Sequence, residues 1–84
     1  MSPEVLRFRG WVFFFYANER NEPPHIHVRR GDASLKFALV EDAFDVEELE
    51  SYNVSPADRR AVRRILFANL DDLIDEYRKF QGGR

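Results

Sequence analysis

The chain has 84 residues, no cysteine and a formal net charge of −2. This length allows one small domain. The lack of cysteine excludes both a disulfide framework and a cysteine-ligated zinc site. No apolar run approaches the roughly 20 residues of a membrane-spanning helix, and no signal-peptide pattern opens the chain, so we expect a cytoplasmic protein.

Charge is distributed unevenly along the chain. Residues 41–58 contain acidic but no basic side chains, and a cluster of arginines follows at Arg59, Arg60, Arg63 and Arg64. We interpret the arginines as a solvated helix face that pairs with the preceding acidic segment. The alternative is an electrostatic docking surface for a partner.

The first part of the chain is typical of β-structure. Residues 5–9 alternate apolar and polar side chains, the period of a half-buried strand, and Gly10 suits a tight hairpin. Residues 11–17 are apolar throughout and rich in aromatics, which predicts a central strand buried on both faces. Because one helix covers one sheet face, we expect aromatic rings on the other face and a second chain that covers part of it.

Two further strands are predicted after a proline-containing loop. Residues 18–24 include Pro23 and Pro24, which remove backbone donors and favour an ordered loop. Residues 25–30 alternate again, so Ile26 and Val28 face one way and the other face carries His25, His27 and Arg29. Residues 33–40 repeat this pattern, with an outward face of Ser34, Lys36 and Ala38.

The C-terminal half is expected to be mainly helical. Residues 41–54 read as an acidic connection, with a short strand near 44–46 or a helical turn over 47–52 as alternatives. Ser55 and Pro56 are typical of a helix start. Apolar residues then recur at helical spacing, at Val62, Ile65, Leu66, Leu70, Leu73, Tyr77 and Phe80, with Asn69 interrupting the stripe.

The predicted fold is therefore a single α+β domain over residues 1–84. We expect an antiparallel sheet of about four strands within residues 4–40. One long amphipathic helix, about residues 56–80, packs on one face of that sheet.

His25 and His27 are the only histidines in the sequence. Residues two apart on a strand point to the same face, so these two histidines would lie roughly 6.5–7 Å apart along the chain. They could ligate a metal with Glu22 or Glu19, or act as acid and base on a phosphodiester whose phosphate Arg29 binds. Alternatively, hydrogen bonds between His25 and the neighbouring loop fix the register of the strand. We favour no metal and predict no cofactor.

A basic sheet surface is a further possibility. Arg7, Arg9 and Lys36 lie on neighbouring predicted strands and could face the same side as the histidines. A basic sheet with nearby aromatics is typical of some single-strand RNA binders. We interpret the aromatic run at residues 11–16 as core rather than as a stacking platform.

One segment carries a family resemblance. Its motif residues are Asn18, Glu19, Asn21, Glu22, Pro23, Pro24, His25 and His27. With the strands around it, this motif resembles the small bacterial family called domain of unknown function 4160. The resemblance implies a short single-domain protein of no established activity, often encoded beside another small protein, domain of unknown function 2442. That arrangement resembles a toxin–antitoxin module.

We therefore interpret the chain as a non-enzymatic protein-interaction module, one component of a two-protein, toxin–antitoxin-like system. Its partner would be a small operon-encoded protein or a second copy of the chain. The alternatives are a metal-independent endoribonuclease that uses His25, His27 and Arg29, and an RNA-binding module. The predicted binding residues are Arg7, Arg9, Asn18, Glu19, Asn21, Glu22, Pro23, Pro24 and Lys36.

Overall fold

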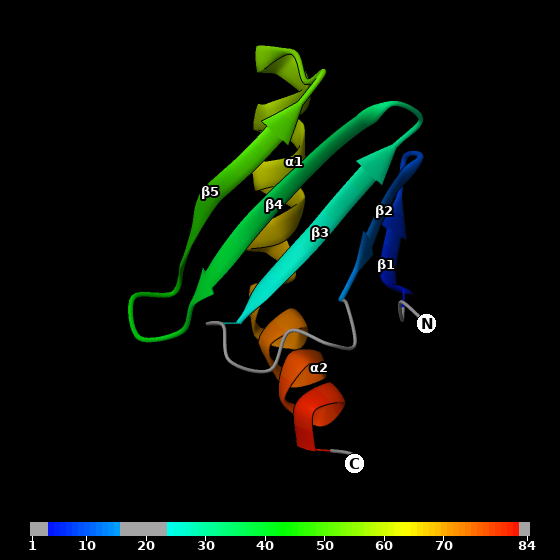
Figure 1. The fold of residues 1–84 in the computed structure, drawn as a ribbon. Coiled ribbons are helices and arrows are strands. Elements are labelled where there is room, and N and C mark those ends of the chain that lie inside the picture. Colours follow the sequence, from blue (N-terminus) through cyan, green and yellow to red (C-terminus); the bar gives the residue numbers. More distant parts are fainter. Residues whose placement is uncertain (1–3, 16–23, 83–84) are drawn as a thin grey trace.

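The computed structural model describes residues 4–15 and 24–82. They form an α+β fold of five antiparallel strands followed by two helices (Figure 1). The elements are β1 (Glu4–Phe8), β2 (Trp11–Phe14), β3 (His25–Arg30), β4 (Ala33–Val40), β5 (Asp45–Tyr52), α1 (Pro56–Ala68) and α2 (Leu70–Gly82). The α+β class predicted from the sequence is confirmed.

The sheet is a meander in which each strand pairs with the next, in the order β1-β2-β3-β4-β5. The hairpin expected at Gly10 is present. Its two loop residues, Arg9 and Gly10, have φ angles of 53° and 85°, and two positive φ angles are what a type I′ hairpin turn requires. This tight turn places β1 at one edge of the sheet.

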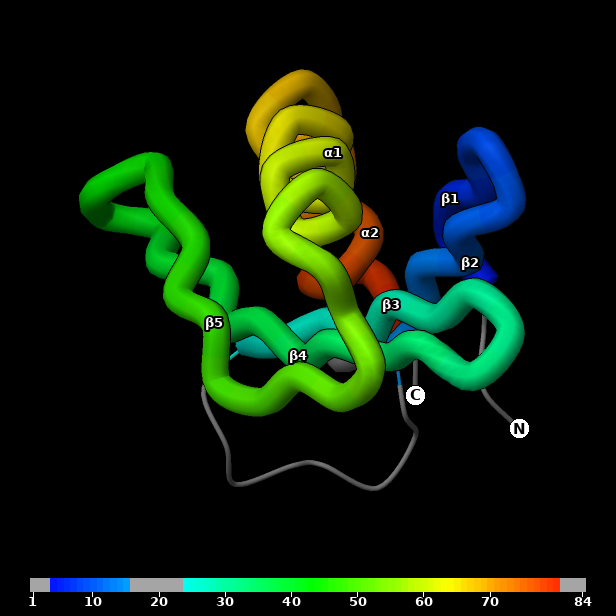
Figure 2. Tube along the Cα trace, turned by 90° about the horizontal axis from the view of Figure 1, so that it is seen from above, coloured from blue at the N-terminus to red at the C-terminus, as the bar shows by residue number. Residues whose placement is uncertain are grey.

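Both helices pack on the same face of the sheet, which curves around them so that β5 and the β1–β2 hairpin lie on opposite sides of α1 (Figure 2). The core fills the space between the two layers. Its most deeply buried side chains are Trp11, Phe13, Phe15, Ile26, Val28, Phe37, Val62, Leu66 and Leu70. The alternation predicted for β3 and β4 is confirmed, since Ile26, Val28 and Phe37 all belong to this core.

The aromatic run of β2 divides unequally between the two faces. Trp11, Phe13 and Phe15 pack in the core on the helix side. Phe14 points to the helix-free face, yet only 7 % of its surface is exposed. An aromatic ring on the helix-free face is therefore confirmed for Phe14, but among the described residues this strand leaves no large exposed aromatic surface for a second chain to cover.

A fifth strand occupies most of the predicted acidic connection. The alternative of a short strand near residues 44–46 overlaps its start, whereas the alternative of a helical turn over 47–52 is wrong. β5 pairs with β4 from Val40↔Asp45 to Ser34↔Tyr52. The strand was missed because Val46 is its one buried residue, and because the register shift opposite Lys36 and Phe37 makes Leu49 an extra residue. Such a β-bulge reverses the side-chain alternation, so no period of two is visible in the sequence.

The single predicted helix is two helices that meet at Asn69. The side-chain Nδ2 of Asn69 donates to the carbonyl oxygen of Ile65 at 2.8 Å, and its backbone N–H bonds Leu66 at 3.2 Å instead. Because the side chain takes the acceptor that a regular turn would use, the ladder breaks. The bend keeps both apolar stripes on the sheet, including Leu70 and Leu73. Neither described helix has the length and apolarity to span a membrane.

Two ion pairs fasten α1 to the sheet. Arg59 donates to Glu48 of β5 at 2.7 Å and also to the hydroxyl of Ser51. The hydrogen bond from Arg59 holds the pKa of Glu48 below its ordinary value. This contact confirms, for Arg59, the expected pairing between the arginine cluster and the acidic segment. At the end of β3, Arg30 bonds Asp58 at 2.9 Å, and its guanidinium lies 4.2 Å from the centre of the Trp11 ring.

Candidate binding face

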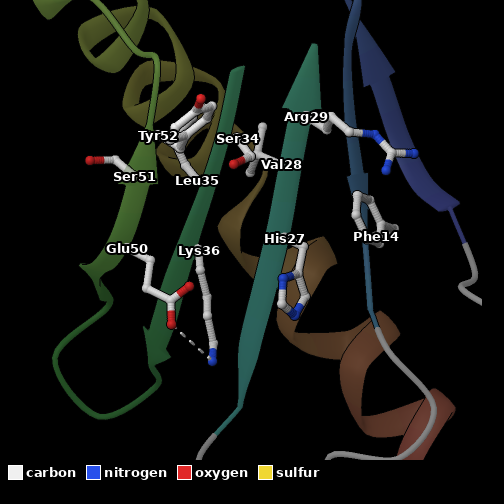
Figure 3. A pocket seen from close by; sticks show the side chains of 10 residues that line it. All are labelled: Phe14, His27, Val28, Arg29, Ser34, Leu35, Lys36, Glu50, Ser51 and Tyr52. Carbon is white, nitrogen blue, oxygen red and sulfur yellow. Dashed lines mark ion pairs between the residues drawn. The ribbon is translucent and has the colours of Figure 1, made fainter. Parts of the chain in front are cut away.

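The helix-free face of the sheet carries a row of side chains that crosses four strands. The strand register places Phe14 of β2 beside His27 of β3, His27 beside Lys36 of β4, and Lys36 beside Glu50 of β5. Figure 3 shows these four side chains on the same face. We call Phe14, His27, Lys36 and Glu50 the central row.

A second row runs parallel to the first, through Arg29, Ser34 and Tyr52. Between the two rows lies a shallow hollow of about 220 Å³ (Figure 3). Tyr52 stands at its rim with 70 % of its surface exposed. Exposed tyrosine beside polar groups is common in protein interfaces, because its ring is apolar and its hydroxyl can bond.

Aromatic contacts hold the centre of this face in place. The rings of Phe14 and His27 stack with centroids 5.5 Å apart and planes 20° from parallel. The guanidinium carbon of Arg29 lies 5.3 Å from the centre of the Phe14 ring, within cation–π range. Phe14 is thus a buried ring against which two β3 side chains that reach the surface, His27 and Arg29, pack.

The charge of the face changes sign from one side to the other. Basic side chains, Arg29 and Lys36, lie on β3 and β4. Acidic side chains, Glu47 and Glu50, lie on β5, opposite Ala38 and Lys36 in the register. The boundary falls between Lys36 and Glu50, whose Nζ and Oε2 atoms are 4.0 Å apart. The face therefore presents a basic band and an acidic band side by side.

The two histidines occupy different environments. His27 is half-buried and lines the hollow. His25 has 2 % of its surface exposed and meets His27 edge to face, with ring centroids 5.4 Å apart. His25 follows Pro24, whose carbonyl accepts a hydrogen bond from Leu39 N–H at 2.8 Å. Only His27 of the pair is thus positioned to touch a ligand at the hollow.

The other predicted site residues lie in different places. Arg7 lies on the helix-free face, as expected, in register with Val12 and Arg29. There its guanidinium bonds Glu4 at 2.9 Å. This hydrogen bond lowers the pKa of Glu4. Arg9 lies in the β1–β2 turn, not on a strand as expected, and sits 5.3 Å from the Phe8 ring. The motif residues Asn18, Glu19, Asn21, Glu22 and Pro23 lie outside the described residues.

Metal ligation by His25 and His27 would need Glu22 or Glu19 as a third ligand, and both glutamates lie outside the described residues. Within residues 4–15 and 24–82, no group of three or more histidine, aspartate or glutamate side chains is arranged to hold a metal ion.

Several residues of the face were not predicted from the sequence. Tyr52 and Glu50 lie in residues 41–54, which the sequence predicts as a connection, and Phe14 lies in the aromatic run that it predicts as core. Ser34 was placed on the outward face by the alternation of its strand but was not recognised as part of a site. Val46 and Tyr52 are the residues that could have indicated β5, but the bulge between them places their side chains on opposite faces of the sheet.

Comparison with known proteins places the chain in a family. A family model described as "Domain of unknown function (DUF4160)" matches residues 10–78. The chain belongs to the DUF4160 family. The DUF4160 match spans β2 to β5 and most of the two helices, and it begins after β1. No curated protein and no solved structure matches the chain.

Proposed function

We propose that this protein is a protein-interaction module whose docking surface is the helix-free face of the sheet, and that it is one component of a two-protein, toxin–antitoxin-like system. The observation that carries the docking proposal is the division of this face into a basic band and an acidic band. The two-protein system is supported by the resemblance of the Asn18–His27 motif.

Two bands of opposite charge favour a protein over a nucleic acid as the partner. A nucleic-acid backbone is uniformly negative, and its affinity depends on many cationic contacts. Glu47 and Glu50 would repel such a backbone along one side of the face. A protein surface can supply charges of both signs, which fixes the register and orientation of docking.

The face also has the composition of an interface centre. Tyr52, 70 % exposed, provides an aromatic anchor beside the hollow, and tyrosine and arginine dominate the binding energy of many interfaces. The endoribonuclease alternative needs two histidines at one scissile bond. The 2 % exposure of His25 gives that alternative no support.

The proposal is tested by affinity capture from the host lysate with three forms of the tagged chain. These are the native sequence, the double variant Arg29→Glu/Lys36→Glu in the basic band, and the control Arg60→Glu on the exposed surface of α1. The samples are treated with nuclease, and both proteins and RNA are quantified.

The expected result is a small protein at near-equal amounts with the native chain and with Arg60→Glu, and its loss with the double variant. Retention of that protein by the double variant would move the interface off this face. Capture of RNA in place of a protein, lost with the double variant, would replace the proposal by the RNA-binding alternative.

A further inference from the structure

A second surface lies at the β1 edge, on the helix side of the sheet. Leu6 and Phe8 of β1 and Ile65 and Ala68 of α1 line an apolar hollow of about 390 Å³. Phe8 is 46 % exposed there although it belongs to the helix-facing side of its strand. We call the space between β1 and the helices the β1 trough.

The two ends of the β1 trough carry opposite charge. At the Phe8 end it is lined by Arg9 and Arg64. At the Leu6 end, the charged residues that line it are Asp72, Asp75, Glu76 and Lys79. Lys79 lies 3.7 Å from Glu76, and among the described residues the acidic side chains outnumber the basic one at this end.

The strand beside the trough has an open edge. Among the described strands, β1 pairs with β2 on one side and ends the sheet on the other. Such an edge presents backbone donors and acceptors that pair readily with a further strand. An added strand would direct alternate side chains into the trough.

A second copy of this chain fits all three features. A two-fold axis perpendicular to the sheet runs two β1 strands antiparallel. This symmetry would bring the basic end of one trough to the acidic end of the other, with Arg9 of each copy near Asp72 and Glu76 of its neighbour. The apolar residues Leu6 and Phe8 of both copies would meet at the centre. Arg7 does not oppose the pairing, because Glu4 neutralises it within the chain.

We propose that the protein is a homodimer joined through β1, with Leu6 and Phe8 of both copies closing the two troughs. The dimer has one ten-stranded sheet, because each copy contributes five strands. Its helix-free side holds two candidate binding faces, one from each copy. The family match begins at Gly10, so β1 lies outside the matched region, whereas the helix residues that line the trough, apart from Lys79, lie within it.

The test is the mass in solution, measured by sedimentation equilibrium over a concentration series. The native chain is expected at about twice its 10.0 kDa monomer mass. Phe8→Glu places a charge in the apolar seam and is expected to raise the dimer dissociation constant about a hundredfold or more. Phe44→Glu is the matched control, because Phe44 is 49 % exposed in the β4–β5 turn, and it should leave the dimer intact.

Charge reversal tests the relative orientation of the two copies without changing Phe8. It therefore tests the dimer proposal even if Phe8→Glu does not fold. Arg9→Glu and Glu76→Arg should each weaken the dimer about two- to fivefold, as expected of exposed ion pairs. The double variant Arg9→Glu/Glu76→Arg should restore the native dissociation constant.

Three results would overturn the proposal. One is a monomeric native chain throughout the series, and another is a folded Phe8→Glu variant that stays dimeric. The third is the absence of rescue by the double charge reversal. A monomer whose β1 edge binds a strand of a different protein would assign the trough to that protein instead.

Discussion

The two faces of the sheet are built from the same strands but differ in the burial and polarity of their side chains. On the helix side, Ile26, Val28 and Phe37 are buried against α1 and α2. On the helix-free side, the neighbouring positions of the same strands are occupied by His27, Arg29 and Lys36, which reach the surface. Side chains on the helix side are buried in the core, and side chains on the helix-free side can contact a partner.

This difference separates stability from function along each strand. Removing apolar surface from water is the main favourable term in folding, so the helix side determines whether the chain folds. The helix-free side contributes less to folding and can carry polar groups without that constraint. Substitutions at adjacent positions of one strand should therefore have unequal effects on stability and on binding.

The largest effect is expected from Phe37→Ala. Phe37 is fully buried at the centre of β4, and truncating a buried phenylalanine costs about 3–5 kcal/mol. Lys36→Ala, one residue away on the opposite face, should cost less than about 1 kcal/mol. Urea denaturation followed by circular dichroism measures both. Equal losses for the two variants would contradict the division between the faces.

Asn69→Ala should destabilise the protein by about 1 kcal/mol although alanine favours helices. The variant loses the hydrogen bond from Asn69 to the Ile65 carbonyl. A straight helix would also draw Leu70 and Leu73 away from the core. Thermal denaturation tests this, and a stabilised variant would show that the bend between α1 and α2 is not needed.

Glu48→Gln should give a smaller, pH-dependent loss. Arg59 lowers the pKa of Glu48 in the folded protein below its ordinary value of 4.5. The stabilisation is therefore complete above the unfolded pKa and is lost as pH falls through the lowered folded pKa. The difference in unfolding free energy between native and variant should be constant at neutral pH and shrink below about pH 4.5. A difference that grows on acidification would contradict the assignment.

Tyr52→Ala should have the smallest effect on stability and a large effect on binding. Tyr52 is 70 % exposed, so its loss should change the unfolding free energy by no more than about 0.5 kcal/mol. As an aromatic anchor of the interface, it should contribute about 2 kcal/mol to partner binding. Denaturation and isothermal titration with the captured partner give the two values. A large stability loss without a binding change would assign Tyr52 to the fold.

Regular alternation made most of the sheet predictable from the sequence. In β3 and β4 the apolar residues Ile26, Val28, Leu35, Phe37 and Leu39 fall on one face, so the outward positions of His27, Arg29 and Lys36 followed directly. β5 was missed because Leu49 enters as a bulge and reverses the alternation between Val46 and Tyr52. A register shift depends on pairing with β4, and pairing between strands is not visible in either strand alone.

The candidate site was likewise predictable on β3 and β4, where the alternation is regular, and not on β5. The basic side chains on β3 and β4 were expected, whereas the acidic band was not, because Glu47 and Glu50 belong to the missed strand. The helix break at Asn69 left a trace as a polar residue in the apolar stripe, but its consequence depends on a side-chain bond to Ile65. Burial of His25 depends on its tertiary surroundings, which local sequence does not specify.

Site-specific photo-crosslinking in host cells tests the central claim most directly. Replacing Tyr52 with p-benzoylphenylalanine places a reactive ring at the rim of the hollow, and the same replacement at Phe44 gives a control position of substantial exposure in the β4–β5 turn. The helix-free face is predicted to yield a discrete, nuclease-resistant protein adduct from position 52 and none from position 44. The reverse pattern, or no adduct from position 52, would contradict the claim that this face binds a protein.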